Sequence, residues 1–324
     1  MRPKDLLGIW LLSAALSLTT GACLHHAQTD SPSTTPASKE SPKLDVPFEP
    51  SSTEIVEEML QMAGVNGKDL VYDLGCGDGR VVITAAKKTG ARGVGVDLDP
   101  QRIRESAENA RKAGIAGRVK FFQEDLLQTD IHKATVVMLY LWPEVNLRLR
   151  PKLLRELKPG TRVVSHSHDM GTWEAEQSIT ATNGHKVYFW VVPANVSGTW
   201  EWEKRGPKDR ERWLLRLQQS FQKVSGTLRA GAEEMSLKEL ELKGAWLRFA
   251  SEGELKGQIY KIQFEGRVKD HLLEGTMEET SVKGSSRHTW RAKRDPSTAI
   301  HWLPPPLHSV SLPGTDIPFF QGKG

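Results

Sequence analysis

The chain has 324 residues, of which 38% are hydrophobic and 26% charged; this composition is that of a folded globular protein with room for two domains. Its 44 basic and 40 acidic residues leave a formal net charge of +4. Because no dense run of Lys and Arg is interleaved with aromatic residues, no nucleic-acid partner is expected.

Residues 1–23 are typical of a targeting segment. Arg2 and Lys4 precede an apolar run, residues 6–18, which is too short for a comfortable bilayer span and has the length of a secretory signal's apolar region. Small residues then precede Cys23, as they do at a bacterial lipoprotein processing site. We therefore expect an exported or membrane-anchored protein of the bacterial cell envelope, with lipidation at Cys23, an uncleaved anchor and a simple cleaved signal as the alternatives.

Residues 24–47 are rich in Ser, Thr and Pro and cannot form a core, so we expect a flexible linker. The chain has only one cysteine besides Cys23, namely Cys76. If Cys23 carries a lipid, no intramolecular disulfide can form, and the domains do not depend on one.

Helices and strands alternate after the linker. Ser51 or Ser52 can cap a first helix, which Gly64 ends, because the apolar residues between them recur at helical spacing. Asp99, followed by proline, is typical of a helix cap. Strands are then expected at residues 70–74, 93–97, 119–123 and 135–139, and helices at residues 80–88 and 101–113. This alternation predicts an α/β fold with a doubly wound parallel sheet and ligands at the carboxyl ends of its strands.

A glycine-rich turn follows the first of these strands. Gly75, Gly77 and Gly79 are spaced G-x-G-x-G, which differs from the G-x-G-x-x-G of dinucleotide-binding turns. Asp73 stands two places before the first glycine. A carboxylate there would repel a pyrophosphate but would suit a ligand with a cationic amino-acid end, such as S-adenosylmethionine.

Two further acids follow the next strands. Asp97 ends the strand at residues 93–97, where a carboxylate can accept hydrogen bonds from ribose hydroxyls. Asp125 follows the strand at residues 119–123, where a side chain can accept a hydrogen bond from an adenine amino group.

With these motifs, residues 46–193 resemble a class I S-adenosylmethionine-dependent methyltransferase, and we assign residues 48–193 to that domain. Residues 46–51, 73–80 and 140–160 are also similar to bacterial relatives of the mitochondrial lysine methyltransferases that modify the ATP synthase c subunit and the adenine nucleotide translocase. The resemblance implies S-adenosylmethionine as cofactor, Asp73, Gly75, Gly77, Gly79, Asp97 and Asp125 as its binding residues, and a protein lysine as acceptor. The alternatives are a small-molecule methyltransferase and a non-catalytic cofactor-binding protein.

The segment Tyr140-Leu141-Trp142-Pro143 follows the strand at residues 135–139. The resemblance implies that it borders the transferred methyl group, which makes Tyr140 and Trp142 the candidate catalytic residues. Their rings could flank a lysine side chain and stabilise the cation that forms. In the alternative interpretation both rings close the core.

Pro151 interrupts the helical pattern of residues 146–157, so we expect a short helical turn and then a second helix that begins at this proline. A strand at residues 162–166 should follow. His166 and His168 would share one strand face, which with Asp169 would permit a metal site or a general base. The ligand set is incomplete, and a solvated or hydrogen-bonded loop is the favoured interpretation.

Asn183-Gly184 separates two segments, residues 178–182 and 185–192, and this dipeptide favours a β-hairpin turn. The hairpin matches the closing antiparallel pair of the methyltransferase family.

Residues 196–294 lack this alternation and repeat an apolar-x-Gly-x-apolar unit. We expect an antiparallel meander that closes into a small barrel, whose mouth binds a ligand or whose core is filled by side chains. Residues 295–324 are proline-rich and should form an extended tail. The repeated units are Val196–Trp200, Val224–Leu228, Leu242–Trp246, Leu255–Ile259, Phe264–Val268 and Leu273–Met277.

Overall fold

The structure is a computed structural model that describes residues 49–181, 183–205, 210–255, 258–281 and 284–299. The expected targeting segment, Cys23 and the linker to Pro47 lie outside the described residues, as does the tail from residue 300. Within the described ranges, no helix is both long and apolar enough to span a bilayer.

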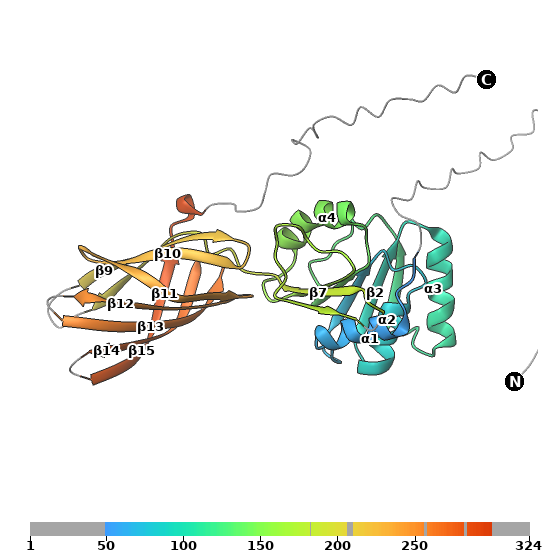
Figure 1. Ribbon diagram of the computed structural model, residues 1–324, viewed down its shortest axis with the longest axis horizontal. Coiled ribbons are helices and arrows are strands. Elements are labelled where there is room, and N and C mark those ends of the chain that lie inside the picture. The colour runs from blue at the N-terminus through green and yellow to red at the C-terminus, as the bar shows by residue number, and fades with distance from the viewer. Residues whose placement is uncertain (1–48, 182, 206–209, 256–257, 282–283, 300–324) are drawn as a thin grey trace, which may run out of the picture. The chain divides into compact units, whose positions relative to one another are not determined.

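A seven-stranded sheet, in which Figure 1 labels β2 and β7, has the order β3-β2-β1-β4-β5-β7-β6. Its first five strands in the chain are parallel, whereas β7 lies antiparallel between β5 and β6. This arrangement confirms both the doubly wound sheet and the closing hairpin that the sequence predicts. The strands are β1 (Leu70–Leu74), β2 (Arg92–Asp97), β3 (Val119–Gln123), β4 (Val136–Leu139), β5 (Arg162–His166), β6 (Gln177–Thr180) and β7 (Lys186–Val191).

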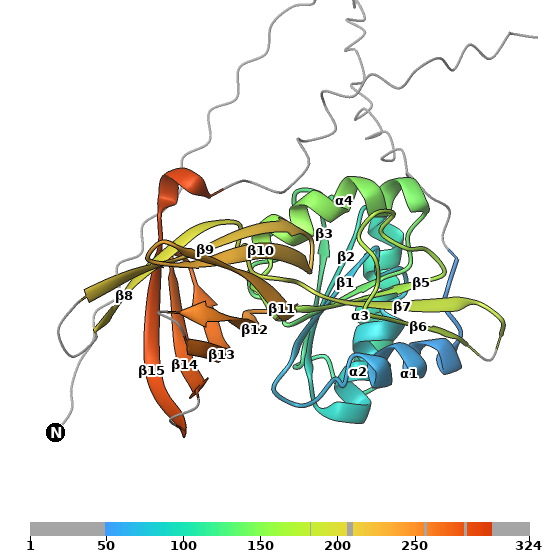
Figure 2. The ribbon, with the colours of Figure 1, turned by 60° about the vertical axis from the view of Figure 1, so that its left-hand side comes forward.

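Helices cover both faces of this sheet. Figure 2 shows α1 (Thr53–Met62) and α2 (Arg80–Thr89) on one side and α4 (Pro143–Glu156) on the other. Successive strand residues point to opposite faces, so Val136 packs with α1 and α2, whereas Val137 packs with α4. Burial on both faces explains why β4 is apolar throughout.

The helix starts follow the predicted capping chemistry. The Ser52 hydroxyl accepts a hydrogen bond from the amide of Ile55 at the start of α1. The Asp99 carboxylate accepts one of 2.7 Å from the amide of Gln101 at the start of α3 (Pro100–Lys112). Each cap satisfies an amide that has no partner within the helix.

The expected break at Pro151 is wrong, because α4 runs continuously from Pro143 to Glu156 with Pro151 inside it. A proline within a helix removes one backbone hydrogen bond. The buried Val145, Leu149 and Leu153 hold both halves of α4 against the sheet, and this packing outweighs the lost bond.

A second sheet closes into an antiparallel barrel of eight strands, which confirms the predicted meander. Closure occurs where β15 pairs with β8. The interior is filled by side chains, among them Trp200, Trp213, Phe249 and Phe264. The strands are β8 (Gly198–Arg205), β9 (Arg210–Ser220), β10 (Lys223–Ala230), β11 (Glu233–Lys243), β12 (Trp246–Leu255), β13 (Gln258–Lys269), β14 (Leu272–Ser281) and β15 (Gly284–Arg294).

The repeated glycine units have two different roles. Gly266 and Gly275 face each other across β13 and β14, where a Cβ on Gly275 would lie 1.9 Å from the carbonyl oxygen of Glu265. If each glycine lay inside a strand, it would stand between two core side chains, but three units do not fit this. Val196–Trp200 begins before β8, whose first residue is Gly198. Gly244 lies in the turn between β11 and β12 with a φ of +57°, and Leu255–Ile259 extends from the end of β12 into β13.

The start of the expected tail is also different from the prediction. Asp295 caps a short 3-10 helix, η1 (Pro296–Thr298), by accepting a hydrogen bond from the amide of Ser297. The Thr298 hydroxyl in turn accepts a hydrogen bond from the amide of Thr199 at the start of β8. The polypeptide therefore turns back onto the barrel instead of continuing extended.

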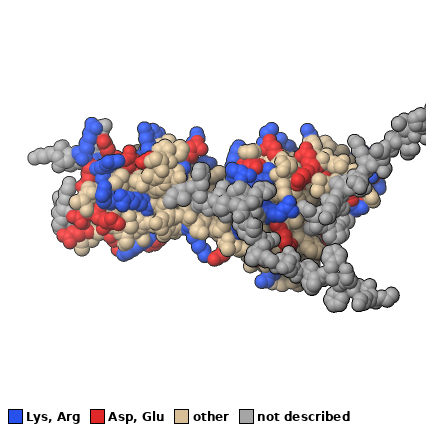
Figure 3. Space-filling model, turned by 90° about the horizontal axis from the view of Figure 1, so that it is seen from above, with Lys and Arg blue, Asp and Glu red and all other residues tan. Residues whose placement is uncertain are grey.

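Basic and acidic side chains are mixed over the face of the molecule seen in Figure 3. On the barrel, cross-strand ion pairs account for part of this pattern, such as Lys238 with Glu252 at 2.8 Å and Arg248 with Glu241 at 3.3 Å. Pairs of this exposure contribute little to stability but keep the barrel exterior polar.

Candidate active site

A cleft lies at the carboxyl ends of β1, β2 and β4, around the point where the strand order of the sheet reverses. This is the usual ligand position in open α/β sheets. Six of the eight residues that the sequence predicts line the cleft. These are Asp73, Gly75, Asp97, Asp125, Tyr140 and Trp142.

The other two predicted residues, Gly77 and Gly79, shape the turn that forms one wall. Gly75, Gly77 and Gly79 have φ values of +86°, +52° and +79°, which side-chain-bearing residues rarely adopt. A Cβ on Gly75 would lie 2.8 Å from the Leu141 side chain, and one on Gly79 would lie 2.7 Å from the Phe121 ring. The turn therefore requires glycine for its backbone angles and for its close packing.

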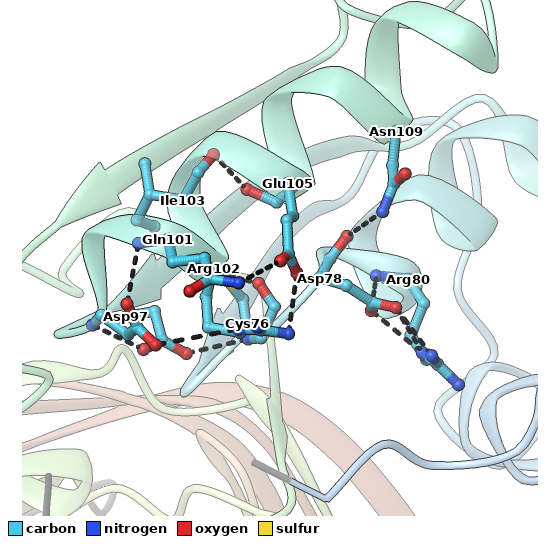
Figure 4. A network of polar contacts seen from close by, with 12 residues as sticks. Cys76, Asp78, Arg80, Asp97, Gln101, Arg102, Ile103, Glu105 and Asn109 are labelled. Atoms are coloured by element: carbon cyan, nitrogen blue, oxygen red, sulfur yellow. Dashed lines mark hydrogen bonds and ion pairs between the residues drawn. The ribbon is translucent and has the colours of Figure 1, made fainter.

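Asp97 connects the turn to the end of β2. Its carboxylate accepts hydrogen bonds of 2.9 Å from the amides of Gly77 and Asp99, one on each oxygen (Figure 4). A carboxylate oxygen has two acceptor positions, so each oxygen can still accept a ligand hydroxyl. The two amides thus orient the carboxylate before any ligand arrives.

Asp73 is almost completely buried at the base of the cleft, with 4% of its surface exposed. Burial, and then the negative charges of Asp97 and Asp78, raise the pKa of its carboxyl to about 8. A cationic ligand group beside it would favour the ionised form. The site therefore has a carboxyl group whose ionisation depends on a positive partner.

A network that the sequence interpretation did not assign supports the turn (Figure 4). Asp78 forms an ion pair of 2.7 Å with Arg80, and Arg80 also donates a hydrogen bond of 2.8 Å to the carbonyl of Ser51. Asn109 donates to the carbonyl of Asp78 at 3.0 Å. Asp78 lies inside the glycine motif and Arg80 directly follows it, which is the sequence signal for them, but their roles depend on contacts with distant segments.

Asp125, which the sequence predicts to lie on the adenine side of the cofactor, is in the segment after β3. Asp125 lines the cleft and accepts a hydrogen bond of 2.8 Å from the amide of Leu127. Glu124, beside it, also lines the cleft and was not predicted. Glu49 and Ser51, from the segment before α1, were missed as well. The buried residues of α1 pack against α2 and the sheet. The residues that line the cleft in this part of the chain therefore come from the segment before α1.

Tyr140 and Trp142 differ in exposure. Tyr140 is half-buried, its ring lies 3.9 Å from that of His166 between centroids, and burial together with the charge of Glu49 raises its pKa. Trp142 is the residue before α4 and is 52% exposed. The interpretation that Trp142 closes the core is therefore wrong, whereas the intervening Leu141 is buried.

His166 and His168 do not share a face. The strand ends at His166, and Ser167 has a φ of +65°, which turns the backbone so that His168 lines the cleft while His166 is buried behind it. Ser51 and His185 contact the two ring nitrogens of His166. Among the residues that the structure describes, no group of three or more His, Cys, Asp or Glu side chains could hold a metal ion.

A family model described as the ANTKMT methyltransferase domain matches residues 73–177. A protein-lysine N-methyltransferase of Saccharolobus islandicus is 44% identical to this chain over 151 residues, which cover 45% of this chain and 94% of that protein. The chain belongs to this methyltransferase family. This chain is also 35% identical over 142 residues to the Homo sapiens lysine N-methyltransferase of the ATP synthase c subunit. That match spans 44% of this chain and 59% of the human protein.

Among solved structures, an RNA methyltransferase from Salinibacter ruber in complex with S-adenosyl-L-homocysteine shares 45% sequence identity. The match covers 50% of this chain and 98% of that chain, with a TM-score of 0.44. The barrel strands lie outside the region that the family model matches.

S-adenosylmethionine is the methyl donor of this methyltransferase, and the residues present fit it. The cleft offers a wall without side chains at Gly75, an oriented carboxylate at Asp97 and a buried carboxyl at Asp73 whose charge a cation would stabilise. When bound, the cofactor supplies an electrophilic methyl group. The task of the protein is then to align a neutral nucleophile with that group and to exclude water.

Proposed function

We propose that this methyltransferase methylates the side-chain nitrogen of a lysine in a protein. The observation that carries the proposal is the half-exposed Trp142 ring beside Tyr140 at the rim of the cleft. Two aromatic rings at this position can flank the aliphatic part of a lysine and stabilise the cation at its end. Several relatives support the same acceptor, since they are named as lysine methyltransferases, including the adenine nucleotide translocase enzyme of Mus musculus.

The charges at the cleft also suit a lysine. Glu49, Glu124 and Asp125 line it and would favour a positively charged side chain over an anionic one. In this assignment Asp97 accepts hydrogen bonds from the cofactor ribose, Asp125 accepts from its adenine, and Asp73 faces its cationic end. The barrel interior is packed with side chains in its described part, which removes the support for a small substrate held inside the barrel.

The decisive experiment uses purified full-length protein, S-adenosylmethionine with a labelled methyl group, and a membrane extract. Mass spectrometry of digested proteins should find the label on lysine, and the Asp97→Ala variant should give no label. Label found only in small molecules would establish the small-molecule alternative, and no label under cofactor-binding conditions would establish the non-catalytic one.

We also propose that the protein is exported and tethered to a membrane through Cys23. Arg2 and Lys4 before the apolar run at residues 6–18 favour a positive end that stays inside, and residues 24–47 have the composition of a tether. An exported enzyme needs the methyl donor outside the cytoplasm, so an anchored chain facing the cytoplasm is the competing arrangement.

Two measurements separate these arrangements. A reporter that is active only outside the cytoplasm, fused after Gly324, should be active, and a silent reporter would refute export. The Cys23→Ser protein should lose its lipid and leave the membrane fraction. If this variant stays in that fraction at an unchanged mass, lipidation at Cys23 is refuted.

A further inference from the structure

A chain of hydrogen bonds connects the cleft with the protein surface. Ser51 lines the cleft, and its hydroxyl oxygen lies 2.8 Å from Nδ1 of His166. Nε2 of His166 lies 2.9 Å from Nδ1 of His185. Ser51 and His166 are buried, whereas His185 is exposed in the turn between β6 and β7. The chain of bonds therefore begins at the site and ends in solvent.

A second branch reaches the same histidine. Tyr140 lines the cleft, and its side chain hydrogen-bonds with Ser167 and Glu49. The Ser167 hydroxyl lies 3.2 Å from Nδ1 of His185. Both polar routes from the rim of the cleft thus converge on His185.

The side chains of Ser51, His166 and His185 can each both donate and accept a hydrogen bond. A serine hydroxyl does so through one oxygen, and a neutral imidazole donates from one nitrogen and accepts at the other. The chain of bonds therefore has two complete arrangements. In one, Ser51 donates to His166 and His166 donates to His185; in the other, every bond is reversed. The passage of one proton along the chain converts the first arrangement into the second.

His166 is suited to pass a proton without keeping it. Burial, and then the neighbouring His185 and His168, lower its pKa to about 4, so the ring stays neutral at neutral pH. The other groups that face it are the adjacent Tyr140 ring and the Ser51 hydroxyl. The Glu49 carboxylate contacts Tyr140.

We propose that Ser51, His166 and His185 form a proton-exit path that deprotonates the acceptor amine before methyl transfer. The inference rests on the proposed lysine acceptor, whose side chain is an ammonium ion at neutral pH and has no electron pair with which to attack. It gives Ser51 a direct role at the amine. His166 and His185 act through Ser51 as positioning and relay residues.

Each proton that leaves a group on this path is replaced or released. One ammonium proton moves to the Ser51 oxygen while the hydroxyl proton moves to Nδ1 of His166, the Nε2 proton of His166 moves to Nδ1 of His185, and the Nε2 proton of His185 passes to water. The freed electron pair of the amine then forms the nitrogen–carbon bond. The methyl–sulfur bond breaks at the same time, and its electron pair stays on sulfur.

The test compares His185→Gln with the wild type on a peptide that carries the lysine labelled in the membrane extract. Glutamine keeps hydrogen-bonding capacity but cannot relay a proton. General acid–base groups contribute roughly 100- to 10,000-fold, so we expect the rate to fall at least about 10-fold at neutral pH. The ratio of the His185→Gln rate to the wild-type rate should rise toward one near pH 10. This is about the pKa of lysine, so the acceptor amine there loses its proton without help from the protein.

His132→Gln is the matched control, because His132 is an exposed histidine bonded to Asp130 and does not line the cleft. Its rate should equal that of the wild type at every pH. Ser51→Ala should repeat the pH dependence of His185→Gln, whereas Ser51→Thr, which keeps the hydroxyl, should retain activity. Added imidazole should partly restore His185→Gln at neutral pH.

A readout that needs no turnover comes from ¹⁵N spectra of the histidine rings. His166 should stay neutral down to about pH 5, and His185→Gln should change which of its nitrogens carries the proton. A rate ratio for His185→Gln that stays constant with pH, or a His166 ring that is charged at neutral pH, would overturn the path. Such results would not contradict the proposal that the acceptor is a lysine. A wild-type protein that labels no lysine would refute both that proposal and the proton-exit path.

Discussion

The backbone amide of Gly77 donates a hydrogen bond of 2.9 Å to the carboxylate of Asp97, which lies 20 residues further along the chain. This bond joins the glycine turn after β1 to the end of β2, and these two elements supply one wall of the cleft and the Asp97 carboxylate. The carboxylate thus orients the turn, and the turn orients the carboxylate.

Replacing Asp97 by Ala should therefore abolish useful cofactor binding. It removes the proposed ribose acceptor and leaves the amides of Gly77 and Asp99 without this partner. Hydrogen bonds to a charged group contribute about 1.5–3 kcal/mol each, which corresponds to roughly a tenfold to more than hundredfold loss of affinity. Calorimetric titration with S-adenosylmethionine measures this loss. Asp130→Ala, an exposed acid outside the cleft, is the control, and equal affinities of the two variants would contradict the assignment.

The sheet and the place of Asp73 and Asp97 at the cleft could be predicted from the sequence because their signals are local. An apolar strand followed by Gly75, Gly77 and Gly79 requires a tight turn, and parallel strands bring their carboxyl ends together, which places Asp73 beside Asp97. The continuity of α4 could not be predicted, because local chemistry at Pro151 favours a break and only packing against the sheet opposes it.

The segments that complete the site were beyond a local pattern. Ser51 forms a hydrogen bond with His166, which lies 115 residues further along the chain, and no sequence motif at either residue predicts this contact. The glycine repeats of the barrel show a similar ambiguity. The same apolar-x-Gly-x-apolar sequence pattern occurs in the strand interior at Gly266 and in the turn at Gly244, and only strand pairing distinguishes the two.

Cofactor binding should release a proton through Asp73. Its pKa in the folded protein is about 8, so the free site is largely protonated near pH 7, and a cationic ligand would expel that proton. Calorimetry in buffers of different ionisation enthalpy should detect about one released proton between roughly pH 6 and pH 7.5. The Asp73→Asn variant should release none. A buffer-independent binding enthalpy in the wild type would contradict this contact.

The same carboxyl should affect the stability of the free protein. Its folded pKa lies above the ordinary value of 3.8, so between about pH 4 and pH 8 the folded state holds a proton that the unfolded state has lost. The contribution of Asp73 to the free energy of unfolding therefore falls as pH rises through this window. Denaturant unfolding of Asp73→Asn should show a smaller decrease over the same range, and parallel profiles would contradict the raised pKa.

Gly275→Ala should destabilise the barrel. Its Cβ would lie 1.9 Å from the carbonyl oxygen of Glu265 and 2.4 Å from Cα of Gly266, so β13 and β14 would have to move apart. Overpacking of this kind costs about 1–3 kcal/mol. Gly117→Ala is the control, since nothing lies within 4 Å of its added Cβ and the backbone there has no positive φ. Unfolding midpoints that change equally would show that the close approach is not structural.

Trp142→Ala should lower turnover far more than cofactor affinity, because the ring at the rim would contact the acceptor and not the cofactor. With 52% of its surface exposed, it should also leave the free energy of unfolding within about 0.5 kcal/mol of the wild type. Trp246 of β12 is the matched control, since it is 53% exposed and belongs to the barrel. Trp246→Ala should change neither turnover nor affinity. Steady-state rates on the identified peptide, with calorimetric affinities for S-adenosylmethionine, separate the cases. A Trp142→Ala protein that loses affinity and turnover equally would show that this ring supports the cofactor and not the lysine.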